Sequence, residues 1–120
     1  MPRLPEYDPL DVTATRQQIN DWRRTQEEAP LLVDGFFLDV DRESLHRMEL
    51  RLNHWDQTGT ASVAWMTAEN HQLWLAPNDL RKLYDNALVE KSRRSGALHE
   101  AAQQFKRDGV TLRQLREWKA

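Results

Sequence analysis

The segment 31–38, LLVDGFFL, constrains the fold more than any other part of the sequence. Asp34 and Gly35 stand between two apolar runs, which is the signature of a two-residue β-hairpin turn. Such a turn needs positive φ, and glycine adopts positive φ because it has no Cβ atom. Strands joined by so short a turn pair antiparallel, whereas a parallel pair needs a long crossover. The sequence therefore predicts an antiparallel hairpin over 31–38 and disfavours a parallel βαβ sheet.

A second antiparallel hairpin is indicated by two short apolar runs, 62–67 and 72–76, with a polar turn between them. Because side chains alternate along a strand, Trp74 faces the side opposite to its two leucine neighbours. Some tryptophan surface is therefore expected to lie away from the main core. The two hairpins either stand apart or join in one four-stranded sheet, and the sequence leaves both arrangements open.

Two segments before the second hairpin have helical periodicity. Residues 13–28 carry a narrow apolar stripe, and Asp11 or Thr13 is the expected capping residue. Residues 42–55 carry apolar residues spaced three and four apart, which places them on one helix face. Asp41 precedes this second segment and is expected to cap it.

A long helix is predicted after the second hairpin. It begins with Pro77 in its first turn or with Asn78 as its cap, and it ends before Gly109. The polar residues 91–96 interrupt the apolar stripe, and Gly96 costs about 1 kcal/mol within a helix. We expect one continuous helix with a solvated middle, because the apolar stripe resumes in register on the far side.

The chain divides into three parts on this interpretation. Residues 1–11 contain three prolines and are expected to form an extended arm, which either docks on its own domain or straps onto a partner. Residues 12–108 form a single α+β domain, in which two antiparallel hairpins pack with three main helices. Residues 109–120 form a short C-terminal helix that Thr111 caps.

Catalytic and metal-binding patterns are missing from the sequence. It has no cysteine, and its four glycines are too far apart for a phosphate-binding or dinucleotide-binding loop. His46 and His54 lie on one predicted helix about 12 Å apart along its axis, too far to share a metal ion. The acidic cluster of Asp34, Asp39 and Asp41 belongs to a turn and a helix cap. We therefore predict neither an enzyme nor a protein with a metal, a cofactor or a small-molecule substrate.

The charge pattern disfavours nucleic acid and membranes as partners. Formal net charge is −2, so no strong positive field surrounds the chain. The basic cluster 91–94 lies between Glu90 and Glu100, which favours a solvated helix face over a phosphate-binding site. Apolar stretches fall short of the roughly 20 residues that a membrane span needs.

Large apolar side chains are the remaining candidates for function. The chain has five tryptophans, and tryptophan is enriched in protein interfaces. The terminal position of the last helix suits docking onto a partner, as does the outward face of the second hairpin. The acidic first half and basic second half would also suit contacts between copies in a homo-oligomer. The predicted contact residues are Trp118, Leu115, Leu112, Trp74, Leu4 and Tyr7.

Residues 31–105 resemble an uncharacterised domain family of tailed phages and prophages, whose genes often lie beside tail-fibre and tail-tip genes. The family pattern is an apolar strand with an Asp-Gly turn, an acidic helix cap, a Trp-Thr-Asn type hairpin and a long helix. In this chain the pattern corresponds to Leu32-Val33-Asp34-Gly35-Phe36-Phe37, to Asp39–Ser44, to Trp65-Met66-Thr67-Ala68-Glu69-Asn70, and to Leu73–Leu75 followed by Leu80–Leu83.

The resemblance implies a phage tail protein that is made in the host cytoplasm and contacts fibre, tail-tip or baseplate proteins in the virion. A minor structural component in the tail tip, baseplate or fibre attachment is the first expectation. An assembly chaperone that leaves before the virion matures is the alternative. A small phage protein that binds a host factor is the second alternative. The resemblance transfers no catalytic residue.

Overall fold

The computed structural model describes residues 9–58 and 62–119. The predicted α+β class is confirmed, with two antiparallel hairpins, three main helices and a short C-terminal helix. In chain order the elements are η1 (Pro9–Asp11), α1 (Arg16–Glu28), β1 (Leu31–Val33), β2 (Phe36–Leu38), α2 (Arg42–Thr58), β3 (Val63–Met66), β4 (Gln72–Leu75), α3 (Pro77–Asp108) and α4 (Leu112–Glu117).

The first hairpin has the turn that its sequence predicts. Asp34 and Gly35 have φ of 50° and 85°, and positive φ at both central residues is the mark of a type I′ turn. This turn matches the right-handed twist of the strands, and it places Val33 opposite Phe36. The second hairpin pairs Val63 with Leu75 in the same antiparallel manner.

The two hairpins form separate two-stranded sheets, so the four-stranded alternative is wrong. One backbone hydrogen bond of 2.9 Å joins them, from the N–H of Ala68 to the carbonyl of Phe37. The rest of the outer edge of β3 faces α2 across an open groove and makes no further bond to the first hairpin. There the Ala64 carbonyl accepts a hydrogen bond of 2.6 Å from Arg51.

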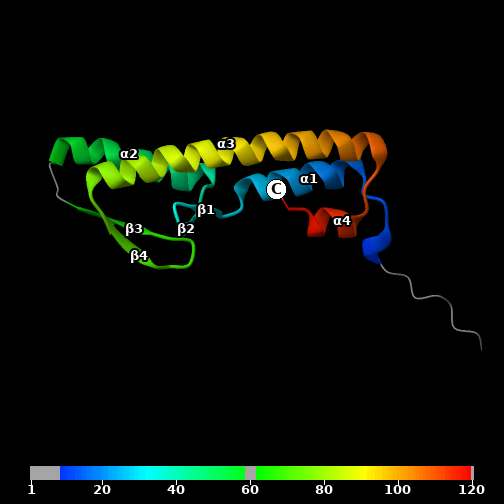
Figure 1. Cartoon of the computed structure of the whole chain (residues 1–120), viewed down its shortest axis with the longest axis horizontal. Helices are drawn as coiled ribbons and strands as arrows, with labels where there is room; N and C mark the ends of the chain where they lie inside the picture. The colour runs from blue at the N-terminus through cyan, green and yellow to red at the C-terminus, as the bar shows by residue number, and fades with distance from the viewer. Residues whose placement is uncertain (1–8, 59–61, 120) are drawn as a thin grey trace, which may run out of the picture.

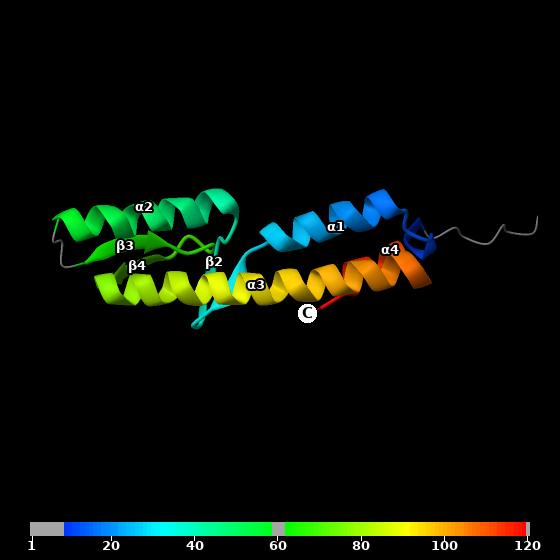
Figure 2. The same cartoon turned by 90° about the horizontal axis from the view of Figure 1, so that it is seen from above.

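Helix α3 is the spine of the molecule. Its 32 residues span about 48 Å at 1.5 Å per residue. Figure 1 shows the other elements distributed along it, and Figure 2 shows α2 and α1 following one another along one side. The first part of α3 packs with α2 and the hairpins, whereas the last part packs with α1 and α4. The helix continues through Gly96, as predicted.

Two apolar cores lie at opposite ends of α3. Trp65, Leu75 and Tyr84 each pack against both buried clusters of the first core, and so join them. The first core consists of Val33, Leu38, Val40, Leu45, Met48, Leu52, Leu80, Leu83 and Ala87. The second consists of Ala14, Ile19, Ala102, Val110 and Leu115, with Trp22, Phe105 and Leu112 packed against it.

A polar seam separates the cores at the middle of α3. Arg94 donates to the carbonyls of Glu27 and Ala29 at 2.6 and 2.8 Å, and Lys91 donates to the carbonyl of Val40 at 2.6 Å. The prediction of a solvated face is therefore wrong for Lys91 and Arg94. These side chains satisfy carbonyls that the end of α1 and the loop before α2 leave without helical partners. Burial lowers the pKa of Arg94, although Glu28 and Glu27 act in the opposite direction.

The segments before α1 and after α3 meet at the far end of the spine. Thr13 and Thr111 form an antiparallel bridge, and the N–H of Leu112 donates to the carbonyl of Val12 at 3.0 Å. The cap of α1 is Thr15, which forms a capping box with Gln18. The predicted caps Asp11 and Thr13 are wrong, because Asp11 lies in η1 and Thr13 lies in the bridge. Asp41 and Thr111 cap α2 and α4, as predicted.

The turn of the first hairpin gives a stability test. Replacing Gly35 by valine is expected to lower the free energy of unfolding by about 2 kcal/mol, because a β-branched residue resists positive φ. Gly96→Ala is the matched control. Gly96 lies in α3 with open space around the position of a Cβ atom, so alanine there should stabilise by about 1 kcal/mol. Urea denaturation measures both, and an unchanged midpoint for Gly35→Val would contradict the turn assignment.

Candidate functional site

Trp74 is the most exposed of the large apolar side chains that the structure describes, with 69% of its surface open to solvent. Its neighbours Leu73 and Leu75 are half-buried, and Leu75 packs on the first core. The predicted alternation of the second hairpin is therefore confirmed. A tryptophan so exposed leaves a large apolar area in water, which is a feature of interaction sites.

Four other apolar side chains are exposed on the hairpins, and one of them, Phe36, is the cross-strand partner of the buried Val33. Met66 is 51% exposed and shares a face with Trp74, since Ala64 is the cross-strand partner of Trp74 and lies two residues before Met66. Leu32 and Phe37 are cross-strand partners and are 56% and 45% exposed. We call Leu32, Phe37, Met66 and Trp74 the hairpin face.

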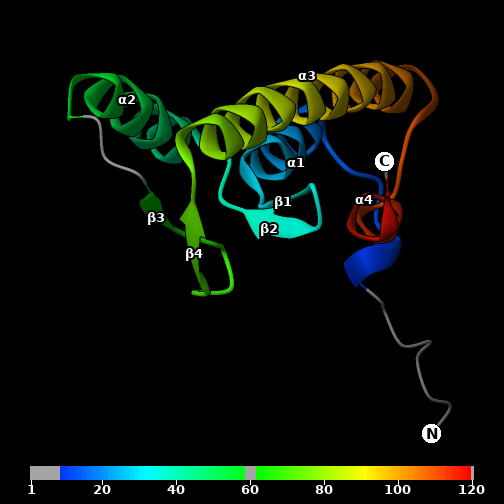
Figure 3. The same ribbon diagram turned by 60° about the vertical axis from the view of Figure 1, so that its left-hand side comes forward.

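Both hairpins project from the same side of the spine, as Figure 3 shows. The bond between Ala68 and Phe37 fixes them to each other at one point. Sequence reasoning missed Leu32 and Phe37. The sequence pattern that could have predicted them is the unbroken apolar runs 31–33 and 36–38. Because side chains alternate between the two faces of a strand, the middle residue of each run must face away from the other two.

The predicted contact residues of the C-terminal helix lie against the chain itself. Leu115 is buried in the second core, and Leu112 packs beside it. The ring of Trp118 meets the ring of Trp22 edge-on, with a centroid distance of 5.3 Å and an angle of 90°. Trp22 in turn lies 5.7 Å from Phe105. Much of the apolar surface expected to dock on a partner is thus used for docking α4 onto α1 and α3.

The predicted arm is described only in its last three residues. Leu4 and Tyr7, the two contact residues predicted there, lie outside the described residues. Pro9–Asp11 form the 3₁₀ turn η1 instead of an extended segment, and Asp11 pairs with Arg113 of α4 at 3.1 Å. This part of the arm therefore docks on its own domain.

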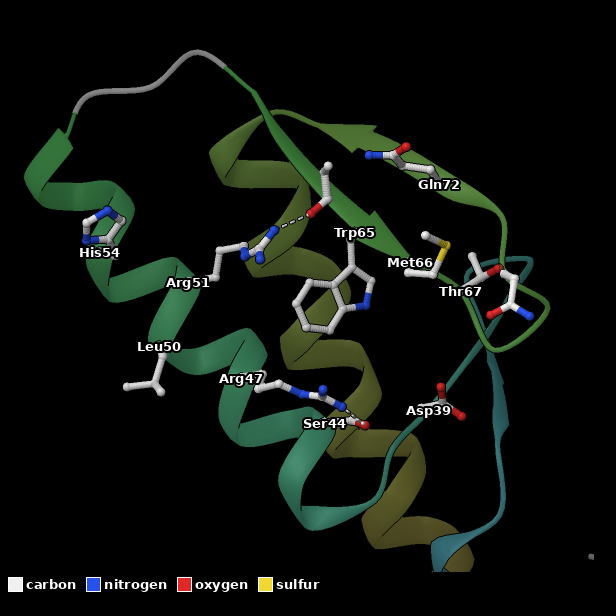
Figure 4. A pocket seen from close by; sticks show the side chains of 12 residues that line it. Asp39, Ser44, Arg47, Leu50, Arg51, His54, Trp65, Met66, Thr67 and Gln72 are labelled. Atoms are coloured by element: carbon white, nitrogen blue, oxygen red, sulfur yellow. Dashed lines mark hydrogen bonds between the residues drawn. The ribbon is translucent and has the colours of Figure 1, made fainter.

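An open groove of about 740 Å³ lies between α2 and β3, beside the hairpin face. Figure 4 shows α2 forming one wall, with Arg47 and Arg51 extending from it, and β3 forming the other. Trp65 lies between the two walls. Leu50 and Met66, both exposed, also line the groove. Its lining thus combines apolar side chains with polar and charged ones, which include two guanidinium groups and the carboxylate of Asp39.

The two arginines of the groove are held differently. Arg51 donates to the Ala64 carbonyl at 2.6 Å, and its guanidinium carbon lies 5.7 Å from the centre of the Trp65 ring, within cation–π range. These contacts fix Arg51 against β3. Arg47 donates to the Ser44 hydroxyl at 3.2 Å and has further N–H groups beyond this bond.

Ser44 connects the groove to the start of α2. Hydrogen bonds from its side chain and its backbone N–H hold the pKa of Asp41 below the ordinary value, against the opposing effect of burial. The stabilising contribution of Asp41 is therefore complete above its unfolded pKa and is lost as the pH falls through the folded pKa. Asp41 serves as a helix cap, as the sequence predicted, and does not line the groove.

A second open groove of about 770 Å³ lies near the start of α2 and is lined by both signs of charge. Its Lys91 lies 3.7 Å from Glu28, and the N–H of Arg42 donates to Glu28 as well. Burial raises the pKa of Tyr84, with smaller contributions from Glu49 and Asp85. These charges compensate one another, so this groove favours no ligand of one sign.

Within residues 9–58 and 62–119, no group of three or more histidines or carboxylates is placed to hold a metal ion. Among the described helices, none combines the length and the apolar character that crossing a membrane requires. Comparison of the chain with protein-family models, with curated proteins and with solved structures gives no match.

Proposed function

We propose that this chain works by binding another protein through the hairpin face. The exposure of Trp74 carries the proposal, since 69% of a tryptophan side chain lies in water on a folded hairpin. Burying such a side chain in a partner removes a large apolar area from water, at about 25 cal/mol per Å². Leu32 and Phe37 on the first hairpin and Met66 on the second are further exposed apolar side chains.

The setting we propose is the tail of a bacteriophage, where the chain is a minor structural component of the tail tip, baseplate or fibre attachment. The support for this setting is the sequence resemblance of residues 31–105. The alternative within the same setting is a fibre-assembly chaperone, which would use the same face for a temporary contact. Mass spectrometry of purified virions separates them, because a structural component is present in stoichiometric amounts and a chaperone is absent.

Trp74→Ala tests the hairpin face. The amount of the chain per purified particle is expected to fall by about tenfold or more in this variant. The reason is that a central tryptophan contributes about 2 kcal/mol or more to an interface. The readout is the amount of the chain in purified virions. Thermal unfolding of the isolated variant should be unchanged, since Trp74 packs little within its own chain.

Val89→Ala provides the matched control, because Val89 is also exposed but lies on α3. This variant should be retained like the wild-type chain. Equal retention of the Trp74→Ala and wild-type chains would contradict the proposal. Capture of a bacterial host enzyme, with tail proteins left unbound, would favour the host-factor alternative.

A further inference from the structure

The groove between α2 and β3 has an excess of positive charge. Arg47 and Arg51 line it, and Asp39 is the carboxylate among its lining residues. In the part of the chain that the structure describes, neither arginine forms an ion pair. By contrast, Lys91 and Arg93 pair with Glu28 and Glu90. The groove thus presents cations that form no ion pair within the described chain, although the charge of Arg47 also helps to lower the pKa of Asp41.

Arg47 is the cation that is available to a ligand. Its bond to Ser44 orients the side chain along α2, and the remaining N–H groups of a guanidinium can hold a carboxylate through two parallel bonds. Arg51 is committed to Ala64 and Trp65. Arg51 adds positive potential to the groove, but its main effect is to occupy the carbonyl of Ala64 on the edge of β3.

The edge of β3 presents backbone groups to the same groove. Backbone groups alternate along a strand, and Ala64 and Ala68 both direct theirs away from β4, toward Arg51 and Phe37 respectively. Met66 lies midway between them, so its N–H and carbonyl also face away from β4. Ala64 and Ala68 already have hydrogen-bond partners, in Arg51 and Phe37. The backbone N–H and carbonyl of Met66 between them can pair with a short extended segment, as in recognition by strand addition.

Apolar side chains line the groove beside these backbone groups. Leu50 from α2 and Met66 from β3 are exposed on opposite walls. The Trp65 ring has Arg51 over it, so that face of the indole is closed to the stacking by which proteins hold single-stranded nucleic acid. The surface therefore suits a peptide better than a nucleic acid.

We infer that this groove binds an extended acidic segment of a protein partner, with a carboxylate on Arg47 and a neighbouring apolar side chain between Leu50 and Met66. The inference rests on the proposed function, because it takes the partner to be a protein. It adds the chemistry of the partner, namely alternating carboxylates and aliphatic side chains in an extended conformation.

Two synthetic peptides test the inference on the full chain. The probe is fluorescein-labelled Gly-Leu-Asp-Leu-Asp-Leu-Gly, and its counterpart has lysine in place of aspartate. The acidic peptide is expected to bind at least about tenfold more tightly than the basic one. Amide signals of Ala64 and Met66 and the indole signal of Trp65 should shift in its nuclear magnetic resonance titration. Equal affinity for both peptides, or shifts confined to other residues, would overturn the inference.

Arg47→Glu is the decisive variant. It should weaken binding of the acidic peptide by at least about tenfold, because attraction is replaced by repulsion. Arg16→Glu makes the same change of charge on exposed α1 and should leave the affinity unchanged. Undiminished binding by Arg47→Glu would refute the role of the groove. So would displacement of the peptide by a single-stranded oligonucleotide that binds more tightly, which would indicate a phosphate ligand.

The two proposals fail separately. Trp74 does not line the groove, so peptide binding should be the same in Trp74→Ala and wild type. If Trp74→Ala is lost from virions and the wild-type chain does not bind the acidic peptide, the groove inference is contradicted and the proposed function is supported. Peptide binding that depends on Arg47, with full retention of Trp74→Ala, would support the groove and contradict the hairpin face.

Discussion

Replacing Arg94 by alanine is expected to lower the free energy of unfolding by about 3 kcal/mol. The side chain donates to the carbonyls of Glu27 and Ala29, and hydrogen bonds to a charged group contribute about 1.5–3 kcal/mol each. The expected loss stays below the sum of two such bonds, because the Nε–H of Arg94 is buried without a partner. Urea denaturation followed by circular dichroism measures the change.

Two neighbouring variants make the Arg94 test specific. Arg94→Lys keeps the charge but lacks the fork that reaches two carbonyls, so it should lose about half as much stability. Arg93→Ala removes an exposed side chain that pairs with Glu90 across one helical turn, and should cost less than about 0.5 kcal/mol. If Arg94→Ala costs no more than Arg93→Ala, the polar seam does not hold α1 against α3.

Leu80→Ala is expected to lower the free energy of unfolding by about 3–4 kcal/mol. Leu80 is 0% exposed and packs with Met48 and Leu52 of α2. Truncation leaves a cavity that the surrounding helices can fill only in part, and buried leucine-to-alanine changes typically lower stability by about 3–5 kcal/mol. Denaturation in urea gives the total, and hydrogen exchange should show weaker protection in the buried part of α2.

Leu88→Ala is the comparison for Leu80→Ala. It makes the same chemical change on the same helix, but Leu88 is exposed. Its cost should be below about 1 kcal/mol, because little apolar area returns to water and no cavity forms. Similar costs at the two positions would mean that the first core is not packed as described.

Sequence reasoning predicted the parts of the fold that depend on local chemistry. The Asp34-Gly35 turn and the outward direction of Trp74 follow from rules that act over a few residues, and the structure confirms both. The continuity of α3 through Gly96 also followed from local periodicity. These features do not depend on which distant segment lies beside them.

The errors concern contacts between distant segments. Lys91 and Arg94 have the spacing of a solvated helix face, yet carbonyls more than fifty residues away turn them into structural donors. The hydroxyl of Thr15 forms the cap of α1 because Thr13 pairs with Thr111. A local pattern contains no information about such partners.

The candidate site was only partly predicted, because part of it depends on contacts between distant segments. Trp74 was predicted from alternation, but the groove depends on how α2 lies against β3. Arg47 and Trp65 are separated by a loop in the sequence, and only the packing of the helix on the hairpin brings them to one place. Trp118 had the spacing of a docking residue, and the partner that the structure supplies for it is Trp22.

The bridge between Thr13 and Thr111 has a mechanical consequence. It joins the segments before α1 and after α3 beyond the last turn of α3, while the second hairpin lies at the opposite end of that helix and the first hairpin lies partway along it. An attachment made at the tied end would leave the second hairpin at the tip of a stiff arm about 48 Å long, set by the rise of an α-helix, with the first hairpin partway along it. Because one unbroken helix runs the whole distance, a push at either end would be transmitted to the other without a hinge to absorb it.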